Sequence, residues 1–237
     1  EPAVRRDGEW VLLDGEPLAR TPGPLHGIAL DLGTTTVVLR LLDLESGEQV
    51  AAASFENPQR FGGSDVMARI QYDSDHPGRL LQRTLLSYLR HCIDDLDCGS
   101  ETIYEIVMVG NTTMRDLLFG LDVSSIGQRP YRSVTEHELE QGLRESTTIE
   151  STAKKLRLPA FPAARVTSLP LVSGHVGADA AACLLAVDLA GSKGLTAIMD
   201  IGTNTELVVN GGGRMLAASC PAGPAFEGGS ISCGMPG

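Results

Sequence analysis

The chain of 237 residues is 42% hydrophobic and carries a formal net charge of −11. It is long enough to bury a core and near the size at which one core divides into two. With only 19 Lys and Arg residues it lacks the basic face that a phosphate backbone requires, so no nucleic-acid partner is expected. No apolar run approaches the roughly 20 residues that span a bilayer, and no signal peptide opens the sequence. We therefore expect a cytoplasmic protein without a membrane partner.

The cysteines are odd in number and irregular in spacing, which favours free thiols in a reducing compartment over disulfides. They are Cys92, Cys98, Cys183, Cys220 and Cys233. The interval between Cys92 and Cys98 is similar to part of a ferredoxin-type cluster motif, but Cys92 falls within an apolar helical pattern. Both are therefore interpreted as structural.

The first elements predict a meander that follows a linker. Residues 1–26 are polar and rich in proline, and Thr21-Pro22-Gly23-Pro24 is typical of the end of a linker or N-terminal extension. Three short runs of aliphatic and β-branched residues follow, separated by turn residues, and they predict a three-stranded meander. The runs cover residues 27–30, 37–42 and 50–55.

Helices and buried strands are expected after the meander. The longest helix carries an apolar stripe at three- and four-residue steps. The expected elements are helices over 64–72, 78–96, 114–119, 136–143 and 178–189 and strands over 104–109 and 166–172. Residues 121–164 are less regular than the rest and are interpreted as an insertion or subdomain.

The opening pattern returns after residue 194. Asp200-Ile201-Gly202-Thr203-Asn204-Thr205 matches Asp31-Leu32-Gly33-Thr34-Thr35-Thr36, which lies 169 residues earlier, and similar strand patterns follow both. Such a period is too long for a solenoid and predicts two related domains that face each other. They cover residues 27–194 and 195–237, and the second is incomplete, as in an excerpt from a longer protein.

Each copy of the motif has the composition of a phosphate-binding turn. A tight turn between two strands directs several backbone N–H groups at one anion, and Gly33 and Gly202 allow the close approach. Asp31 and Asp200 end their strands, where each carboxylate can hold Mg²⁺ through water while the metal neutralises phosphate charge. Further phosphate contacts are expected from Thr34, Thr35, Thr36, Thr203, Asn204 and Thr205.

Three features between the motifs leave alternatives open. Asp179 can orient an attacking water, or it can be an ordinary acidic residue in the first turn of a helix. His175 is interpreted as a structural loop histidine, with a catalytic base as the alternative. Gly110-Asn111-Thr112-Thr113 either touches substrate or partner, or forms a strand-to-helix turn with a threonine as the N-cap.

The sequence also resembles known families. The paired motifs resemble the two phosphate loops of the actin/sugar-kinase/Hsp70 superfamily, and residues 173–189 resemble its connecting helix. Four strings taken together resemble the ATP-dependent reductive activators of corrinoid proteins, over roughly residues 25 to 237. They are Asn57-Pro58-Gln59-Arg60-Phe61-Gly62, Val109-Gly110-Asn111-Thr112-Thr113-Met114, Asp200-Ile201-Gly202-Thr203-Asn204 and Ala222-Gly223-Pro224-Ala225-Phe226-Glu227-Gly228.

The resemblance implies an α/β, ribonuclease-H-like fold of the actin/Hsp70 ATPase type, with two related lobes, the second truncated, and Mg-ATP between them. It implies an ATPase that couples hydrolysis to uphill electron transfer into a corrinoid (cobalamin) protein, with an electron donor protein as a second partner. The [2Fe-2S] domain and the adenosine-binding motif of that family are expected outside this chain.

Three other functions remain open. A sugar-kinase-like phosphotransferase would need a carboxylate base beside a polyol pocket, and the sequence offers no clear one. A nucleotide-dependent reactivase or binding module is the second. The third is an activator ATPase of a radical dehydratase, which would place a cluster between the subunits of a homodimer, with Cys220 and Cys233 as candidate ligands.

Overall fold

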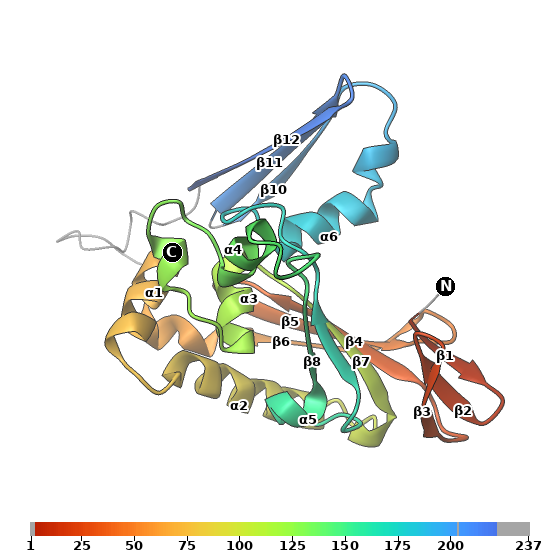
Figure 1. The fold of residues 1–237 in the computed structure, drawn as a ribbon. Helices are drawn as coiled ribbons and strands as arrows, with labels where there is room; N and C mark the ends of the chain where they lie inside the picture. The colour runs from red at the N-terminus through yellow and green to blue at the C-terminus, as the bar shows by residue number, and fades with distance from the viewer. Residues whose placement is uncertain (1–2, 203, 222–237) are drawn as a thin grey trace.

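The computed structural model describes residues 3–202 and 204–221 (Figure 1). Its main body is a six-stranded sheet in the order β6-β5-β4-β7-β9-β8. The strands are β4 (His26–Leu32), β5 (Thr36–Asp43), β6 (Gln49–Glu56), β7 (Ile103–Val109), β8 (Ile149–Thr152) and β9 (Arg165–Ser168). The predicted meander is confirmed as β4, β5 and β6, which pair antiparallel, while β7 runs parallel to β4 and β9 parallel to β7. This is the ribonuclease-H-like arrangement, with β8 added at one edge.

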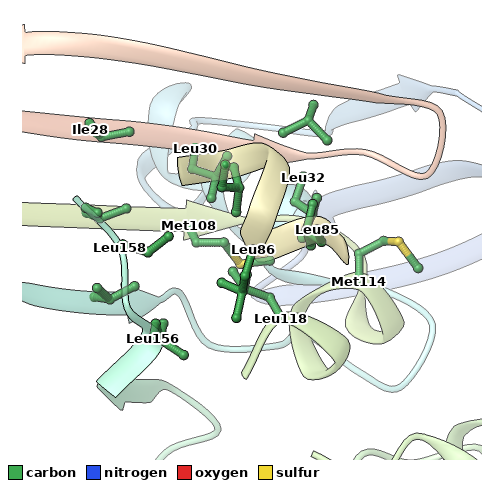
Figure 2. Packing of buried hydrophobic residues seen from close by; sticks show 14 of the residues in the cluster. Ile28, Leu30, Leu32, Leu85, Leu86, Met108, Met114, Leu118, Leu156 and Leu158 are labelled. Carbon is green, nitrogen blue, oxygen red and sulfur yellow. The ribbon is translucent and has the colours of Figure 1, made fainter. Parts of the chain in front are cut away.

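One face of the sheet holds the hydrophobic core. Along β4, Ile28, Leu30 and Leu32 are buried whereas Asp31 is exposed, as expected when successive side chains point to opposite faces. Figure 2 shows the buried side chains against residues of the helices that cover this face, including Leu85. The helices of the main body are α1 (Val66–Asp75), α2 (Leu80–Asp94), α3 (Thr112–Phe119), α4 (Val134–Glu140) and α5 (Ala153–Leu156). The alternation leaves the carboxylate of Asp31 on the opposite face, at the end of its strand.

Side-chain caps place the helix ends where composition alone misplaced them. The helix expected over 136–143 begins earlier, at Val134, because Ser133 and Glu136 form a capping box at its start, and it ends at Glu140. The strand expected over 166–172 is shorter and ends at Ser168.

The expectation of a linker over residues 1–26 is wrong for the residues that the structure describes. Three short strands, β1 (Val4–Asp7), β2 (Trp10–Leu13) and β3 (Glu16–Arg20), form an antiparallel sheet. The hairpin turns are Gly8-Glu9 and Asp14-Gly15, in which Gly8, Asp14 and Gly15 have positive φ angles. A small core that includes Tyr104 packs this sheet against the start of β7, so short strands of mixed polarity were mistaken for a polar linker.

Residues 121–164 are integral to the main body. Their strand β8 pairs antiparallel with β9, and α5 packs against β8. The segment is also joined to α3, because Arg115 donates to the carbonyl of Thr147 at 2.8 Å. Arg115 is buried and forms an ion pair with Asp116, its neighbour in α3. The irregular sequence therefore forms an extra sheet edge and its connections.

After the main body come α6 (Ala178–Ala186) and then the antiparallel sheet of the second lobe, formed by β10 (Thr196–Ile201), β11 (Asn204–Gly211) and β12 (Arg214–Pro221). In Figure 1 this sheet stands above α6, at the end of the main sheet away from β1–β3. Several of its large apolar side chains are exposed, among them Met199, Ile201 and Leu216. None of the described helices is both long and apolar enough to cross a membrane.

Candidate functional site

The repeated motifs lie on opposite sides of a hollow of about 430 Å³ between the lobes. The hollow lies beyond the carboxyl ends of β4 and β10, where ligands of open α/β sheets commonly bind. Its lining residues are Asp31, Gly33, Thr34, Thr35, Thr36, Asn111, Asp179, Asp200, Ile201, Gly202, Asn204 and Glu206. The fold therefore brings together most of the site residues expected from the sequence.

One expected phosphate contact, Thr205, lies away from the hollow. Thr205 is 7% exposed and is not part of the lining, and its hydroxyl makes no hydrogen bond within the described chain. Thr203 lies outside the described residues, as does Cys233. His175 also lies off the hollow, where its ring is 5.4 Å from that of Tyr131.

The first motif forms a tight turn that only glycine fits. The backbone N–H of Gly33 donates to the carbonyl of Thr36 at 3.0 Å. A Cβ atom on Gly33 would lie 2.6 Å from that same carbonyl oxygen, closer than real Cβ contacts allow. The requirement here is for close backbone approach, which glycine meets because it has no Cβ.

Buried donors hold the carbonyl groups of this turn on its protein side. Asn57 donates its side-chain amide to the Gly33 carbonyl at 2.8 Å and its backbone N–H to the Thr35 carbonyl at 2.7 Å. Arg69 donates to the carbonyl of Thr34 at 2.7 Å. In a trans peptide the N–H points opposite to the C=O. The N–H groups that follow these carbonyls therefore point away from Asn57 and Arg69, the orientation that an anion-binding nest on the other side of the turn would need.

The start of α3 is joined to the same turn. Asn111 caps the helix by accepting from the N–H of Met114 at 3.0 Å, so the N-cap is this asparagine and not a threonine. Its amide nitrogen donates to the hydroxyl of Thr34 at 2.9 Å. Asn111 thus positions the side chain of Thr34 while it lines the hollow itself.

Close packing brings the start of α6 to the hollow. The Gly110 carbonyl accepts from the N–H of Ala178 at 3.0 Å, and a Cβ on Gly177 would lie 2.7 Å from that oxygen. Asp179 follows in the first turn. Burial raises its pKa to about 6, assisted by the negative charges of Glu206, Asp200 and Asp31 and opposed by a hydrogen bond from the N–H of Ala180.

The pKa values of two further carboxyl groups in the hollow are also raised. The pKa of Asp31 is raised chiefly because neighbouring protein atoms in the hollow partly desolvate its carboxyl group, although the residue is exposed by surface area, and further by the charge of Asp200. The pKa of Glu206 is also raised, chiefly by burial and further by Asp200, although the hydroxyl of Ser219 donates to it at 2.9 Å. Sequence reasoning missed Glu206, yet a signal was present, because the first motif has the apolar Val37 at the matching position.

The donor set fits a hydrated divalent cation better than a metal held by protein alone. Within the described chain, no three Asp, Glu, His or Cys side chains converge closely enough to form a metal site. Mg²⁺ usually keeps several waters and binds through one or two carboxylates plus substrate phosphates. Asp31 and Asp200, whose mutual repulsion a cation would relieve, suit that mode.

The two turns are related but differ in length. Asp31 pairs with Val38 across β4 and β5, whereas Asp200 pairs with Glu206 across β10 and β11. The second turn is therefore one residue tighter, which places the carboxylate of Glu206 opposite that of Asp200.

The chain is similar to known proteins along most of its length. Residues 26–192 match the RACo middle region, and residues 194–237 match the C-terminal domain of RACo, the ASKHA domain. The corrinoid activation enzyme RamQ of Eubacterium limosum is 32% identical over 232 residues, which cover 95% of this chain and 37% of RamQ. A [Co(II) methylated amine-specific corrinoid protein] reductase of Methanosarcina barkeri is 25% identical over 215 residues, which cover 89% of this chain and 39% of the reductase.

A solved structure agrees with these matches. A reductive activator for corrinoid,iron-sulfur protein has a TM-score of 0.78 and 32% sequence identity, covering 93% of this chain and 34% of that protein. The chain spans little more than a third of the length of the relatives it matches. The matches to the middle region and to the ASKHA domain show that the chain belongs to the RACo family, whose relatives include reductive activators of corrinoid proteins.

Proposed function

We propose that the hollow binds the phosphates of Mg-ATP and that this chain is the ATP-hydrolysing part of a protein that reductively reactivates a corrinoid protein. The observation that carries the proposal is the pair of facing turns, each with an aspartate at its strand end. Membership of the RACo family supports the corrinoid partner, because its relatives are named for that activity.

The residues of the hollow have distinct roles in this proposal. The N–H groups of the first turn hold phosphate oxygens, and Thr34 is held ready by Asn111. Asp31 and Asp200 hold the metal through water. Asp179 orients the attacking water and accepts its proton, for which a carboxyl pKa of about 6 is suitable, since the group is ionised at neutral pH yet more basic than an ordinary aspartate.

ATP influences the corrinoid partner by changing which complex is stable. A nucleotide can bias electron transfer only through different affinities for two conformational states. Shifting an equilibrium from 1:99 to 99:1 takes about 5.5 kcal/mol of differential binding. Closure of the two lobes on ATP, and opening after hydrolysis, can supply that difference, because the site is shared between them.

The rest of the protein completes the reaction. We place the [2Fe-2S] centre that passes on the electron in a domain outside this chain, and we propose that a separate donor protein reduces this centre. A homodimer remains an open alternative. The matches that begin at residues 26 and 194 support the proposed division near residues 27 and 195. The cysteines of the described chain are free thiols, which supports a cytoplasmic location.

Replacement of either metal-holding carboxylate tests the nucleotide site. In the complete protein, Asp31→Ala and Asp200→Ala should each abolish Mg-dependent ATP turnover while circular dichroism shows an intact fold. The control is Asp43→Ala at the end of β5, which should keep full turnover because Asp43 does not line the hollow. Full turnover in both aspartate variants would remove the metal assignment.

A further inference from the structure

Beneath the first phosphate turn lies a buried arginine that sequence reasoning did not single out. Arg69, from α1, is 1% exposed. Its guanidinium donates to the Thr34 carbonyl at 2.7 Å, to the Gly63 carbonyl at 3.0 Å and to the sulfur of Met114 at 3.1 Å. Each of the three nitrogens of this cation therefore has a hydrogen-bond acceptor, but all three acceptors are uncharged and none neutralises the positive charge.

A second buried arginine in the same lobe differs from Arg69, because a buried carboxylate neutralises its charge. Arg115 is 0% exposed, and its ion pair with Asp116, also fully buried, has a length of 2.7 Å. Arg69 forms no ion pair with any carboxylate of the described chain. The acid on its own helix, Asp65, instead accepts from the N–H of Ala68 as the N-cap of α1.

An unpaired buried charge is costly, and the titration of this residue reflects the cost. Burial lowers the pKa of Arg69 to about 10, with Asp65 opposing the shift and Arg60 adding to it. Even so, the guanidinium stays protonated at neutral pH. Because this buried cation has no carboxylate partner, an anion bound near it would be stabilised by its uncompensated positive charge.

The geometry points to the phosphates of the bound nucleotide as that anion, and we propose that Arg69 is a positioning residue for phosphate that acts through the Thr34 peptide. Its hydrogen bond holds the Thr34 carbonyl on the protein side, which turns the N–H of Thr35 toward the hollow. Its positive charge lies on the protein side of the turn and offsets the carboxylates on the hollow side. The inference rests on the proposed phosphate site and assigns that site a fixed cation.

Neutral and charged replacements separate the charge of Arg69 from its packing. In the complete protein, binding of pyrophosphate, ADP and adenosine is measured by calorimetry with Mg²⁺ present. Arg69→Met and Arg69→Gln should weaken pyrophosphate and ADP by about 10-fold or more, because a unit charge in a medium of intermediate dielectric acts over several ångströms. Adenosine affinity should be unchanged. Arg69→Lys keeps the charge and should lose much less.

Arg115→Lys is the matched control, because it alters an equally buried arginine that already has a carboxylate partner. It should lower the melting temperature but leave pyrophosphate affinity at the wild-type level. Arg69→Gln keeps an amide donor for the Thr34 carbonyl, so it provides the neutral variant if Arg69→Met does not fold. If the folded neutral variant binds pyrophosphate with wild-type affinity, the proposed role of Arg69 is overturned, while the proposed phosphate site is not. Failure of the wild-type protein to bind pyrophosphate or ADP would overturn the proposed phosphate site as well.

Discussion

The side-chain amide of Asn111 donates a hydrogen bond of 2.9 Å to the hydroxyl of Thr34, and so links the cap of α3 to the first phosphate turn. The same asparagine accepts from the N–H of Met114. Asn111 thus makes two contacts, the N-cap with Met114 and the hydrogen bond to Thr34, and substitutions can separate their effects.

Asn111→Ala should lose both contacts. We expect a loss of about 1 kcal/mol in the free energy of unfolding from the missing N-cap. We also expect roughly 2- to 10-fold weaker ADP binding, the range for one hydrogen bond. Asn111→Ser keeps a capping oxygen but is too short to reach Thr34, so it should weaken ADP binding with little loss of stability. Equal ADP affinity in Asn111→Ser and wild type, by calorimetry, would show that the Thr34 contact does not serve the nucleotide.

The two turn glycines should differ in their tolerance of a methyl group. A Cβ on Gly33 would lie 2.6 Å from the Thr36 carbonyl oxygen, whereas one on Gly202 would lie 3.2 Å from the Asn204 carbonyl oxygen. Gly33→Ala should therefore cost about 1–3 kcal/mol of stability, as overpacking does, and should disrupt the nest. Gly202→Ala needs only a small shift. Thermal melts and Mg-ATP turnover should rank both properties as wild type, then Gly202→Ala, then Gly33→Ala, and the reverse order of the two variants would refute the geometric argument.

ATP turnover should depend on pH through Asp179. Its pKa is raised to about 6, so the carboxylate that orients water forms as pH rises through 6, and turnover should rise there to a plateau near neutrality. Asp179→Asn should remove most of the turnover at every pH. A wild-type profile without a step near pH 6 would count against Asp179 as the base.

The same carboxyl group should affect stability in the opposite direction. Because its folded-state pKa lies above the ordinary value of 3.8, the folded protein binds this proton more readily than the unfolded chain does. Its contribution to stability therefore falls as pH rises from about 3.8 to about 6. The difference in unfolding free energy between wild type and Asp179→Asn, from denaturant titrations, should shift in favour of the variant across that interval.

A structural feature could be predicted from the sequence where a pattern of a few neighbouring residues determines it. The meander and the paired turns were predictable, because β-branched runs and the Asp-Gly-Thr pattern determine them over a few residues, and the repeat itself places Asp31 opposite Asp200. Asn57 and Arg69 were not predictable as parts of the site. Their contacts with the first turn depend on how η1 (Pro58–Gly62) and α1 pack beneath it, which no local pattern shows.

In the proposed function, nucleotide hydrolysis by this fold serves a corrinoid partner. The most direct measurement is Mg-ATP turnover by the complete protein, with and without a cobalt(II) corrinoid protein, and with a panel of small sugars and polyols as the comparison. We expect the corrinoid protein to raise turnover and no sugar to be phosphorylated. Stimulation by a sugar with a phosphorylated product, and no response to the corrinoid protein, would contradict the proposed function.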